Sequence, residues 1–274
     1  MITPCFNDGD LIRETLTSLR EDEPLEHVIV DDASTEPATR EQLARIEAEG
    51  IRVVRREENG GVLGARATAL EATSAPYVFP LDSDDLAMPG VLGRMADRLD
   101  ADPGAVVCFG DYEEFGDSEL TRAVPERIDP FRIAYVNELP VSSLFRRSLL
   151  EELGGWSAGG FSERSHEDWN LWMAIAERGD RGVYLGPGDV VYRRRMHQGR
   201  LLSSNREQHP RLYRVLKATH PRLFEALPRH RRASDMSPVR KRLYPFVYGG
   251  RRRFAFESTL KSLLDRTGIW TLRR

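Results

Sequence analysis

The feature that most constrains this chain is a group of three carboxylates at positions 82, 84 and 85. The group follows residues 75–80, an apolar run that predicts a buried strand. Carboxylates this close together repel one another unless a cation lies between them, and hard oxygen ligands suit Mg²⁺ or Mn²⁺. The pattern indicates either a metal and diphosphate site at the carboxyl end of a strand or an acidic turn that caps the next helix.

Short apolar runs alternate with amphipathic segments along the first part of the chain. The runs that predict strands are residues 2–6, 27–30, 51–54, 75–80 and 105–109. Helices are expected between them, because the intervening segments carry apolar residues at helical spacing and glycine or proline at their ends. This alternation predicts an α/β fold with a mostly parallel sheet flanked by helices.

Polar loops follow three of the predicted strands, at Asn7, at Asp31-Asp32 and at the acidic turn of residues 82–85. The carboxyl ends of parallel strands share one edge of a sheet, so we expect these loops to converge. Asp8, next to Asn7, is expected to belong to the cap of the following helix.

The remainder of the chain is less regular. Residues 111–140 are acidic and irregular and predict a loop excursion, whereas a helix is expected from His166 to Arg178. From Asn205 onward, prolines separate short helical segments, which predicts a helical C-terminal appendage. We therefore expect an α/β half at residues 1–115, a second half of the same domain at 116–203, and a basic helical region at 204–274.

Composition is that of a soluble globular protein, with 40% hydrophobic and 30% charged residues. No apolar run is long enough to span a bilayer and no stretch resembles a signal peptide, so we expect a cytoplasmic protein. The two cysteines, Cys5 and Cys108, lie beside apolar residues, and we expect buried free thiols.

The net charge of −3 conceals an asymmetry along the chain. Residues 193–274 contain 22 Lys/Arg and 5 Asp/Glu, whereas residues 1–192 contain 18 and 38. An acidic body with a basic C-terminal region predicts either internal docking of the two parts or an anionic partner for the basic part.

The motifs, in this order, resemble those of the family 2 glycosyltransferases of the GT-A fold. The resemblance covers residues 1–203. It implies that residues 1–115 are the nucleotide-sugar-binding half, and that residues 116–203 are the acceptor-binding and catalytic-base half of the same domain. The matching segments are the nucleotide loops at 4–7, 30–35 and 59–66, the metal motif Asp82-Ser83-Asp84, the acceptor-loop motif Gly154-Gly155-Trp156, the catalytic-base motif Glu167-Asp168-Trp169, and the closing motif of Tyr192-Arg193 with His197.

The resemblance implies an inverting, metal-dependent transfer of a sugar from a nucleotide-diphosphate sugar, most often UDP- or dTDP-linked, to a saccharide, lipid-linked or small-molecule hydroxyl acceptor. It implies that Asp168 is the general base, with Glu167 as the second candidate, and that Asp84 and His197 hold Mn²⁺ or Mg²⁺. The residues implied in nucleotide binding are Pro4, Phe6, Asn7, Asp32, Arg66, Asp82 and Ser83. Those implied in acceptor binding are Gly155, Trp156, Glu167 and Trp169.

A structural role is the alternative for each of these residues. Asp32 and Asp168 can cap helices. The resemblance implies that Arg66 contacts the nucleotide or braces the acidic turn, and its structural alternative is a helix-surface ion pair. His197 follows an arginine-rich run and can be simply solvated, while the tryptophans can pack in the core.

Two rival functions are weaker. A nucleotidyltransferase would need a glycine-rich signature with Lys or Arg directly after the first strand, which residues 7–10 do not supply. A non-catalytic nucleotide-sugar-binding partner subunit would have no need of the intact set of Asp82, Asp84 and Asp168.

The basic C-terminal region has three candidate uses. It can form a cationic wall around the diphosphate and acceptor, dock on an anionic membrane at the inner face, or act as a solvated appendage or oligomer contact. Residues 243–248, followed by Arg251–Arg253, mix aromatic and basic residues as interfacial segments do. Nucleic acid is not an expected partner, because no recognised module is present and the body is acidic.

Overall fold

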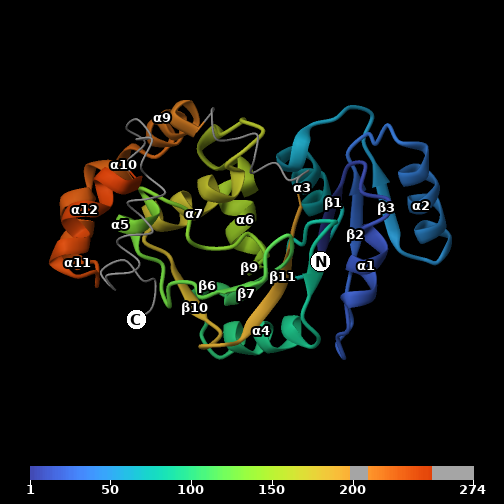
Figure 1. The fold of residues 1–274 in the computed structure, drawn as a ribbon, viewed down its shortest axis with the longest axis horizontal. Helices are drawn as coiled ribbons and strands as arrows, with labels where there is room; N and C mark the ends of the chain where they lie inside the picture. The colour runs from blue at the N-terminus through green and yellow to red at the C-terminus, as the bar shows by residue number, and fades with distance from the viewer. Residues whose placement is uncertain (198–208, 249–274) are drawn as a thin grey trace.

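The fold was analysed in a computed structural model that describes residues 1–197 and 209–248 (Figure 1). The strands are β1 (Ile2–Cys5), β2 (Val28–Asp31), β3 (Arg52–Arg55), β4 (Tyr77–Val78), β5 (Leu86–Ala87), β6 (Ala105–Phe109), β7 (Asp111–Gly116), β8 (Leu120–Arg122), β9 (Leu144–Arg146), β10 (Arg181–Tyr184) and β11 (Val190–Met196). The helices are α1 (Ile12–Ser18), α2 (Pro37–Ala48), α3 (Gly61–Glu71), α4 (Val91–Asp100), α5 (Pro130–Ile133), α6 (Arg147–Leu153), the 3₁₀ helix η1 (Gly155–Gly160), α7 (Glu167–Arg178), α9 (His209–Thr219), α10 (Pro221–Glu225), α11 (Leu227–Ala233) and α12 (Pro238–Tyr248).

A central sheet runs through the molecule. Strands β1, β2 and β3 pair in parallel, and β10, β6, β9 and β4 form a second group in that order. A parallel bridge between Ile2 and Pro80 joins the two groups, with backbone hydrogen bonds from Ile2 to Phe79 and from Leu81 to Ile2. The acidic turn that follows Leu81 therefore begins at the edge to which β1 and β2 also point.

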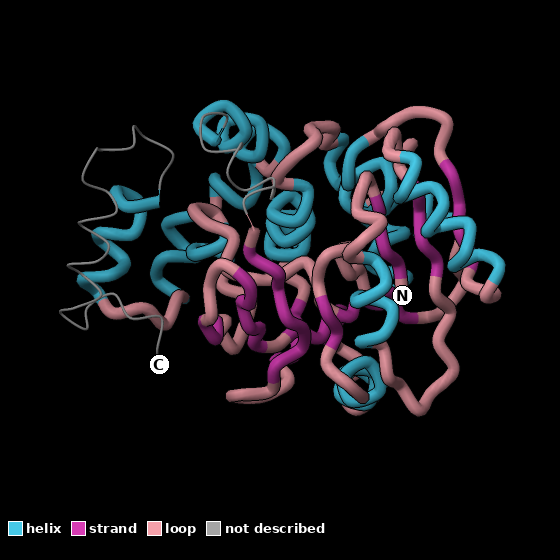
Figure 2. The backbone as a smooth tube through the Cα atoms, turned by 45° about the vertical axis from the view of Figure 1, so that its right-hand side comes forward, coloured by secondary structure: helices cyan, strands magenta, loops and turns pink. Residues whose placement is uncertain are grey.

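The predicted α/β architecture with flanking helices is confirmed, and the direction of the strands is more mixed than predicted. Strand β9 runs antiparallel to both β4 and β6. A second, smaller sheet has the order β5-β11-β7-β8, in which β11 pairs in parallel with β7 but antiparallel with β5. Figure 2 shows the strands of both sheets grouped in the middle of the molecule, with helices around them.

The prediction of a loop excursion at residues 111–140 is wrong. This segment contains β7, β8 and the short helix α5. Strand β7 belongs to the smaller sheet and was not recognised in the sequence because it is rich in charged residues. Glu114 pairs with Arg122 of β8, and Glu113 pairs with Arg193 of β11. Cross-strand ion pairs here take the place of the apolar alternation that marks the other strands.

The C-terminal helices pack against α5 and α7 (Figure 1). Phe131 of α5 packs against Tyr244 of α12 at 6.1 Å between ring centroids. His220, which is 1% exposed, contacts Asn170 at 2.9 Å and Glu177 at 3.2 Å, both on α7. Among the helices in residues 1–197 and 209–248, none is long and apolar enough to cross a membrane.

His220 is expected to be a main attachment point of these helices. Replacing His220 with Ala leaves the buried amide oxygen of Asn170 without its partner, so the free energy of unfolding should fall by about 1–3 kcal/mol. Chemical denaturation measures this change, with His230→Ala on the half-buried surface of α11 as the matched control. Equal stability of the two variants would contradict the assignment.

Candidate functional site

The loops after β1 and β2 are joined, as their shared sheet edge predicts. Asn7 has a left-handed backbone, with φ +60°, and its side-chain oxygen accepts hydrogen bonds from the backbone N–H groups of Thr35 and Glu36 at 2.8 and 3.1 Å. Its own N–H donates to the Ser34 hydroxyl at 3.1 Å. Asn7 thus fixes the loop after β2 against the loop after β1. A direct contact between Asn7 and a nucleotide stays a prediction.

Asp32 is a fixed, buried carboxylate, 3% exposed. Its Oδ1 forms an ion pair with Arg56 at 2.8 Å and accepts the N–H of Gly60 at 2.9 Å. Arg56 also donates to the carbonyl of Gly64 at 3.0 Å. The sequence analysis did not single out Arg56, yet this residue holds Asp32 to the glycine-rich start of α3. Its position at the exit of β3 was the available signal.

The acidic turn forms a compact oxygen cluster. Ligand atoms of Asp82, Asp84 and Asp85 all lie within 4.8 Å of one another. The end of β11 brings His197 to this cluster, with its Nε2 3.1 Å from Oδ2 of Asp84. The predicted pair of metal-ligand candidates, Asp84 and His197, is therefore together in the structure.

A fourth carboxylate adjoins the cluster. Asp8 accepts a hydrogen bond from the hydroxyl of Ser83 at 2.7 Å. Burial raises the pKa of Asp8, and the neighbouring Asp84 and Asp82 act in the same direction. Asp8 does not cap α1 with its side chain, since the cap residue is Leu11 without a side-chain bond. The side chain of Ser83 is 3% exposed and orients Asp8, while its predicted contact with a nucleotide is untested.

Arg195 of β11 fixes the backbone of the acidic turn. Its N–H donates to Oδ1 of Asp85 at 2.8 Å, and its Nε donates to the carbonyl of Asp84 at 2.9 Å. Its other end pairs with Glu14 of α1 at 2.6 Å. The sequence showed an arginine-rich run here but not which arginine turns inward. The structure assigns that role to Arg195.

Arg66 connects the acidic turn to the start of α7. It is 1% exposed, and its two terminal nitrogens lie 2.8 Å from Oδ1 of Asp82 and 2.8 Å from Oε1 of Glu167. Its guanidinium also lies 5.7 Å from the centre of the Trp156 ring. Arg66 braces the acidic turn and, being buried, does not form a helix-surface ion pair, while its predicted contact with a nucleotide stays untested.

Glu167 and Asp168 occupy the first turn of α7 but differ in environment. Burial raises the pKa of Glu167 from 4.5 to about 7, against the opposing charge of Arg66. Asp168 is half-buried, and its Oδ2 accepts a hydrogen bond from the side-chain amide of Asn137 at 2.9 Å. Its Oδ1 accepts the N–H of Trp169 at 2.7 Å. The sequence analysis missed Asn137, since it lies in the segment interpreted as an irregular loop.

The two tryptophans predicted to contact the acceptor lie in the core. Trp156 is 1% exposed and packs against Phe145, and Trp169 is 3% exposed, stacks on Tyr213 and donates its ring N–H to the carbonyl of Ile133. Both rings are thus buried in this structure, and their contact with an acceptor stays a prediction. They support Arg66 and the start of α7. Gly155, with φ +62°, supplies the left-handed turn that places Trp156 inward.

Two further predicted nucleotide contacts lie at β1. Pro4 is buried within this strand, whereas Phe6, just past its end, is 42% exposed. An exposed aromatic ring beside a cluster of fixed polar groups can stack on a planar ligand. The structure thus places the Phe6 ring, the Asp32 carboxylate and the acidic turn at the exits of adjacent strands.

Comparison with known proteins identifies relatives of this chain by sequence and by fold. The model of the family described as Glycosyl transferase family 2 matches residues 1–154, which is more than half of the chain. The putative teichuronic acid biosynthesis glycosyltransferase TuaG of Bacillus subtilis is 46% identical over 89 residues, 31% of this chain and 35% of the relative. The succinoglycan biosynthesis protein ExoU of Rhizobium meliloti is 37% identical over 97 residues, 35% of this chain and 28% of the relative. The aligned stretches thus span about a third of these relatives' lengths.

Solved structures share the fold at low sequence identity. S. aureus TarS 1–349, crystallised in complex with UDP-GlcNAc, superimposes with a TM-score of 0.65 and 21% identity, covering 98% of this chain and 77% of that one. The mannosyltransferase PcManGT from Pyrobaculum calidifontis, in complex with GDP-Man and Mn²⁺, gives a TM-score of 0.57 and 21% identity over 98% of this chain and 80% of that one.

The raised pKa of Glu167 predicts a pH-dependent stability. Folding favours the protonated carboxyl, so its contribution to stability is complete below about pH 4.5 and is lost as the pH rises to about 7. The free energy of unfolding of the wild type, minus that of Glu167→Gln, should therefore fall by about 3 kcal/mol across this range. Urea titrations at a series of pH values measure this difference.

The matched control for Glu167→Gln is Glu71→Gln, which removes an exposed carboxylate from the end of α3, the helix that carries Arg66. If the difference in free energy of unfolding between the wild type and Glu167→Gln did not change with pH, Arg66 would be shown to keep Glu167 ionised throughout this range.

Proposed function

The chain belongs to glycosyltransferase family 2, and we propose that it transfers a sugar from a nucleotide-diphosphate sugar to a hydroxyl acceptor, with inversion at the anomeric carbon. In this proposal Asp168 is the general base, and a divalent cation is held at Asp84 with His197 nearby. The nucleotide is UDP or dTDP. The structures of TarS with UDP-GlcNAc and of PcManGT with GDP-Man and Mn²⁺ support a nucleotide-sugar donor and a divalent metal.

The observation that carries the proposal is the bridge through Arg66. One guanidinium holds Asp82, which follows β4 in the nucleotide half, and Glu167, which adjoins the proposed base. An inverting transfer needs a leaving-group site and a base on opposite faces of one sugar. A rigid, buried link between the two motifs supports their action on a single substrate.

The donor nucleoside is proposed to lie beside Phe6 and Asp32. Both contacts that fix Asp32 are made by Oδ1, so Oδ2 is the oxygen proposed to accept a ring N–H of the base. The exposed ring of Phe6 would cover one face of the base. The N–H of Gly60 donates to Asp32, and a Cβ at Gly60 would collide with the Arg56 guanidinium, so glycine at this position leaves room for Arg56 beside Asp32.

The residues at the acidic turn fit a hard divalent cation. They supply carboxylate oxygens within 4.8 Å of one another and an imidazole beside Asp84, a donor set that suits Mn²⁺ or Mg²⁺. Asp84 and His197 would hold the ion, and Asp8 and Asp82 would complete the negative field around it. When bound, such a cation offsets the charge that develops on the departing diphosphate.

Asp168 is the better of the two base candidates. Glu167 is engaged by Arg66 in the core, whereas Asp168 is half-buried and held in place through both of its oxygens. In the reaction, Asp168 accepts the proton of the acceptor hydroxyl while the oxygen of that hydroxyl bonds to the anomeric carbon. The bond from that carbon to the diphosphate breaks on the opposite face, and the nucleoside diphosphate leaves.

Asp84→Asn should abolish metal-dependent nucleotide binding. With a saturating nucleotide and Mn²⁺, the wild type should gain about 2.7 kcal/mol at a hundredfold excess over the dissociation constant, a rise of several degrees in melting temperature. Thermal unfolding with UDP, dTDP and GDP, with and without Mn²⁺, measures this gain. The exposed Asp97→Asn is the control and should behave as the wild type. Full metal-dependent stabilisation of Asp84→Asn would remove it from the proposed metal site.

Asp168→Asn should keep nucleotide binding and lose turnover by roughly 10²–10⁴-fold, because the acceptor proton has no base. Asn137→Ala should lower kcat by on the order of tenfold with an unchanged donor KM, because the carboxylate loses its amide donor. Adding Asn137→Ala to Asp168→Asn should cost nothing further. Steady-state kinetics on the four proteins measures these effects. Near-normal turnover of Asp168→Asn would exclude it as the base.

A further inference from the structure

Helix α12 carries an exposed apolar face. In the part of the chain that the structure describes, the two most exposed large hydrophobic side chains are Val239, at 54%, and Phe246, at 74%. They are seven positions apart and therefore lie on one face of the helix, with Arg242 between them. The opposite side of α12 packs on α5 through the buried ring of Tyr244. The segment 243–248 is thus divided between core and surface, and Phe246 is its outward ring.

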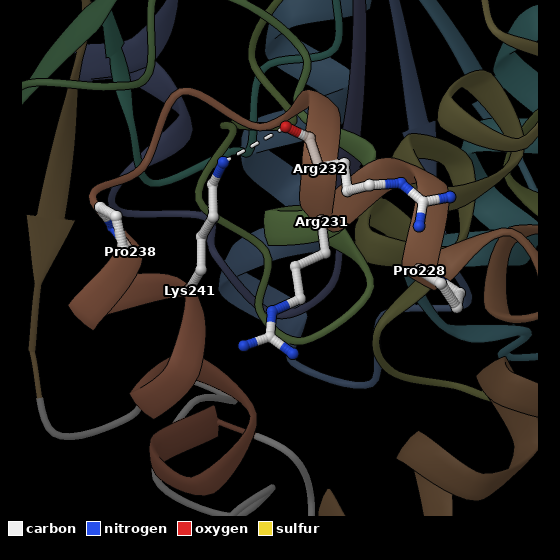
Figure 3. Close-up of a pocket in the computed structure, with 5 residues that line it drawn as sticks. All are labelled: Pro228, Arg231, Arg232, Pro238 and Lys241. Carbon is white, nitrogen blue, oxygen red and sulfur yellow. Dashed lines mark hydrogen bonds between the residues drawn. The ribbon is translucent and has the colours of Figure 1, made fainter.

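A cationic pocket adjoins this face, between α11 and α12. It has a volume of about 460 Å³ and is lined by Pro228, Arg231, Arg232, Pro238 and Lys241. Figure 3 shows Lys241 reaching from α12 toward α11, where its ammonium donates to the carbonyl of Arg232 at 3.4 Å. Three of the five lining side chains are cationic and none is acidic, so the pocket suits phosphate oxygens.

Charge identifies the kind of partner. Residues 226–248 contain six Lys/Arg and one Asp. The C-terminal residues 249–274, which include Arg251–Arg253, contain seven Lys/Arg and two Asp/Glu, so like charge argues against that segment as the occupant of this surface. This surface presents cations beside the exposed side chains of Val239 and Phe246. Its matching partner would present a dense array of anions with an apolar layer beneath them.

We propose that α11 and α12 dock this protein on the phosphate headgroups of an anionic lipid bilayer. Arg231, Arg232 and Lys241 bind headgroup phosphates, and Phe246 enters the boundary between headgroups and acyl chains. The docking surface lies at the end of the molecule farthest from α2 (Figure 1). It uses no residue of the proposed active site, so it stands or falls independently of the reaction.

Vesicle sedimentation with the full chain tests the proposal. Vesicles of equal parts phosphatidylglycerol and phosphatidylcholine should bind the wild type, pure phosphatidylcholine vesicles should not, and high salt should weaken the binding. The double variant Arg231→Glu/Arg232→Glu should lose at least tenfold in partitioning. Its charge-matched control, Arg20→Glu/Arg45→Glu, changes exposed arginines on the other half of the molecule and should bind as the wild type.

The variant Phe246→Ser provides a second test of membrane docking that leaves the charge of the protein unchanged. It should weaken partitioning several-fold and keep the salt dependence, because it removes the inserted ring and not the cations. The side chain is 74% exposed, so its loss leaves the core intact, which the melting temperature verifies.

Four results would overturn the proposal. The first is equal binding to neutral and anionic vesicles. The second is wild-type binding to vesicles by the Arg231→Glu/Arg232→Glu variant. The third is a loss of self-association in that variant, measured by light scattering, which would assign the surface to a second copy of this chain. The fourth is calorimetric binding of inorganic phosphate without vesicle binding, which would assign the pocket to a soluble anion.

Discussion

The buried guanidinium of Arg66 is the interaction on which the proposed site depends. A fully buried charge is tolerated when it is paired, and Arg66 is paired at 2.8 Å with carboxylates from two distant parts of the chain. The ring of Trp156 lies against it as well. Loss of Arg66 would leave the buried carboxylate of Glu167 without its cation and would release Asp82, so Arg66 holds both carboxylates in position. This bridge sets where the acidic turn stands relative to the start of α7.

The smaller sheet adds a second constraint on the same turn. Strand β11 pairs with β5, which directly follows the acidic turn, and carries Arg195 and His197 to it. Arg195 holds the backbone of Asp84 and the carboxylate of Asp85, so the repulsion within the turn is offset by a cation and by oriented N–H groups. Asp84, with His197 at 3.1 Å from its carboxylate, is the residue proposed for metal binding.

Much of the fold followed from local pattern. Buried strands such as β2 and β6 are continuous apolar runs. Glycine marked the start of α3 and the C-terminal end of α7. The convergence of Asn7 with the loop after β2 followed from the parallel topology. The structure of segment 111–140 was not predicted correctly, because cross-strand ion pairs stabilise β7 and its charged sequence resembles that of an acidic loop.

Side-chain direction was the part of the site that the sequence could not supply. The motifs located Trp156 and Trp169 correctly in the chain, but whether a ring faces a ligand or the core depends on packing partners such as Phe145 and Tyr213, which come from other elements. Asn137 and Arg56 were missed for the same reason. Each acts on a carboxylate distant in sequence. The position of Arg56 at the exit of β3 could have marked it as a candidate, but the sequence does not show which carboxylate an amide or a guanidinium will reach.

The C-terminal helices are more than an appendage. His220 binds Asn170, and Asn170 in turn donates to the carbonyls of Trp156 and Ala158. On the other side of α7, Tyr244 of α12 packs on α5, which precedes the loop that holds Asn137 against Asp168. Two separate sets of buried contacts thus connect the basic end of the molecule to the proposed base. If α11 and α12 dock on a surface, these contacts would fix the orientation of α7 and the proposed base relative to that surface, because a packed core transmits a rigid-body constraint with little loss.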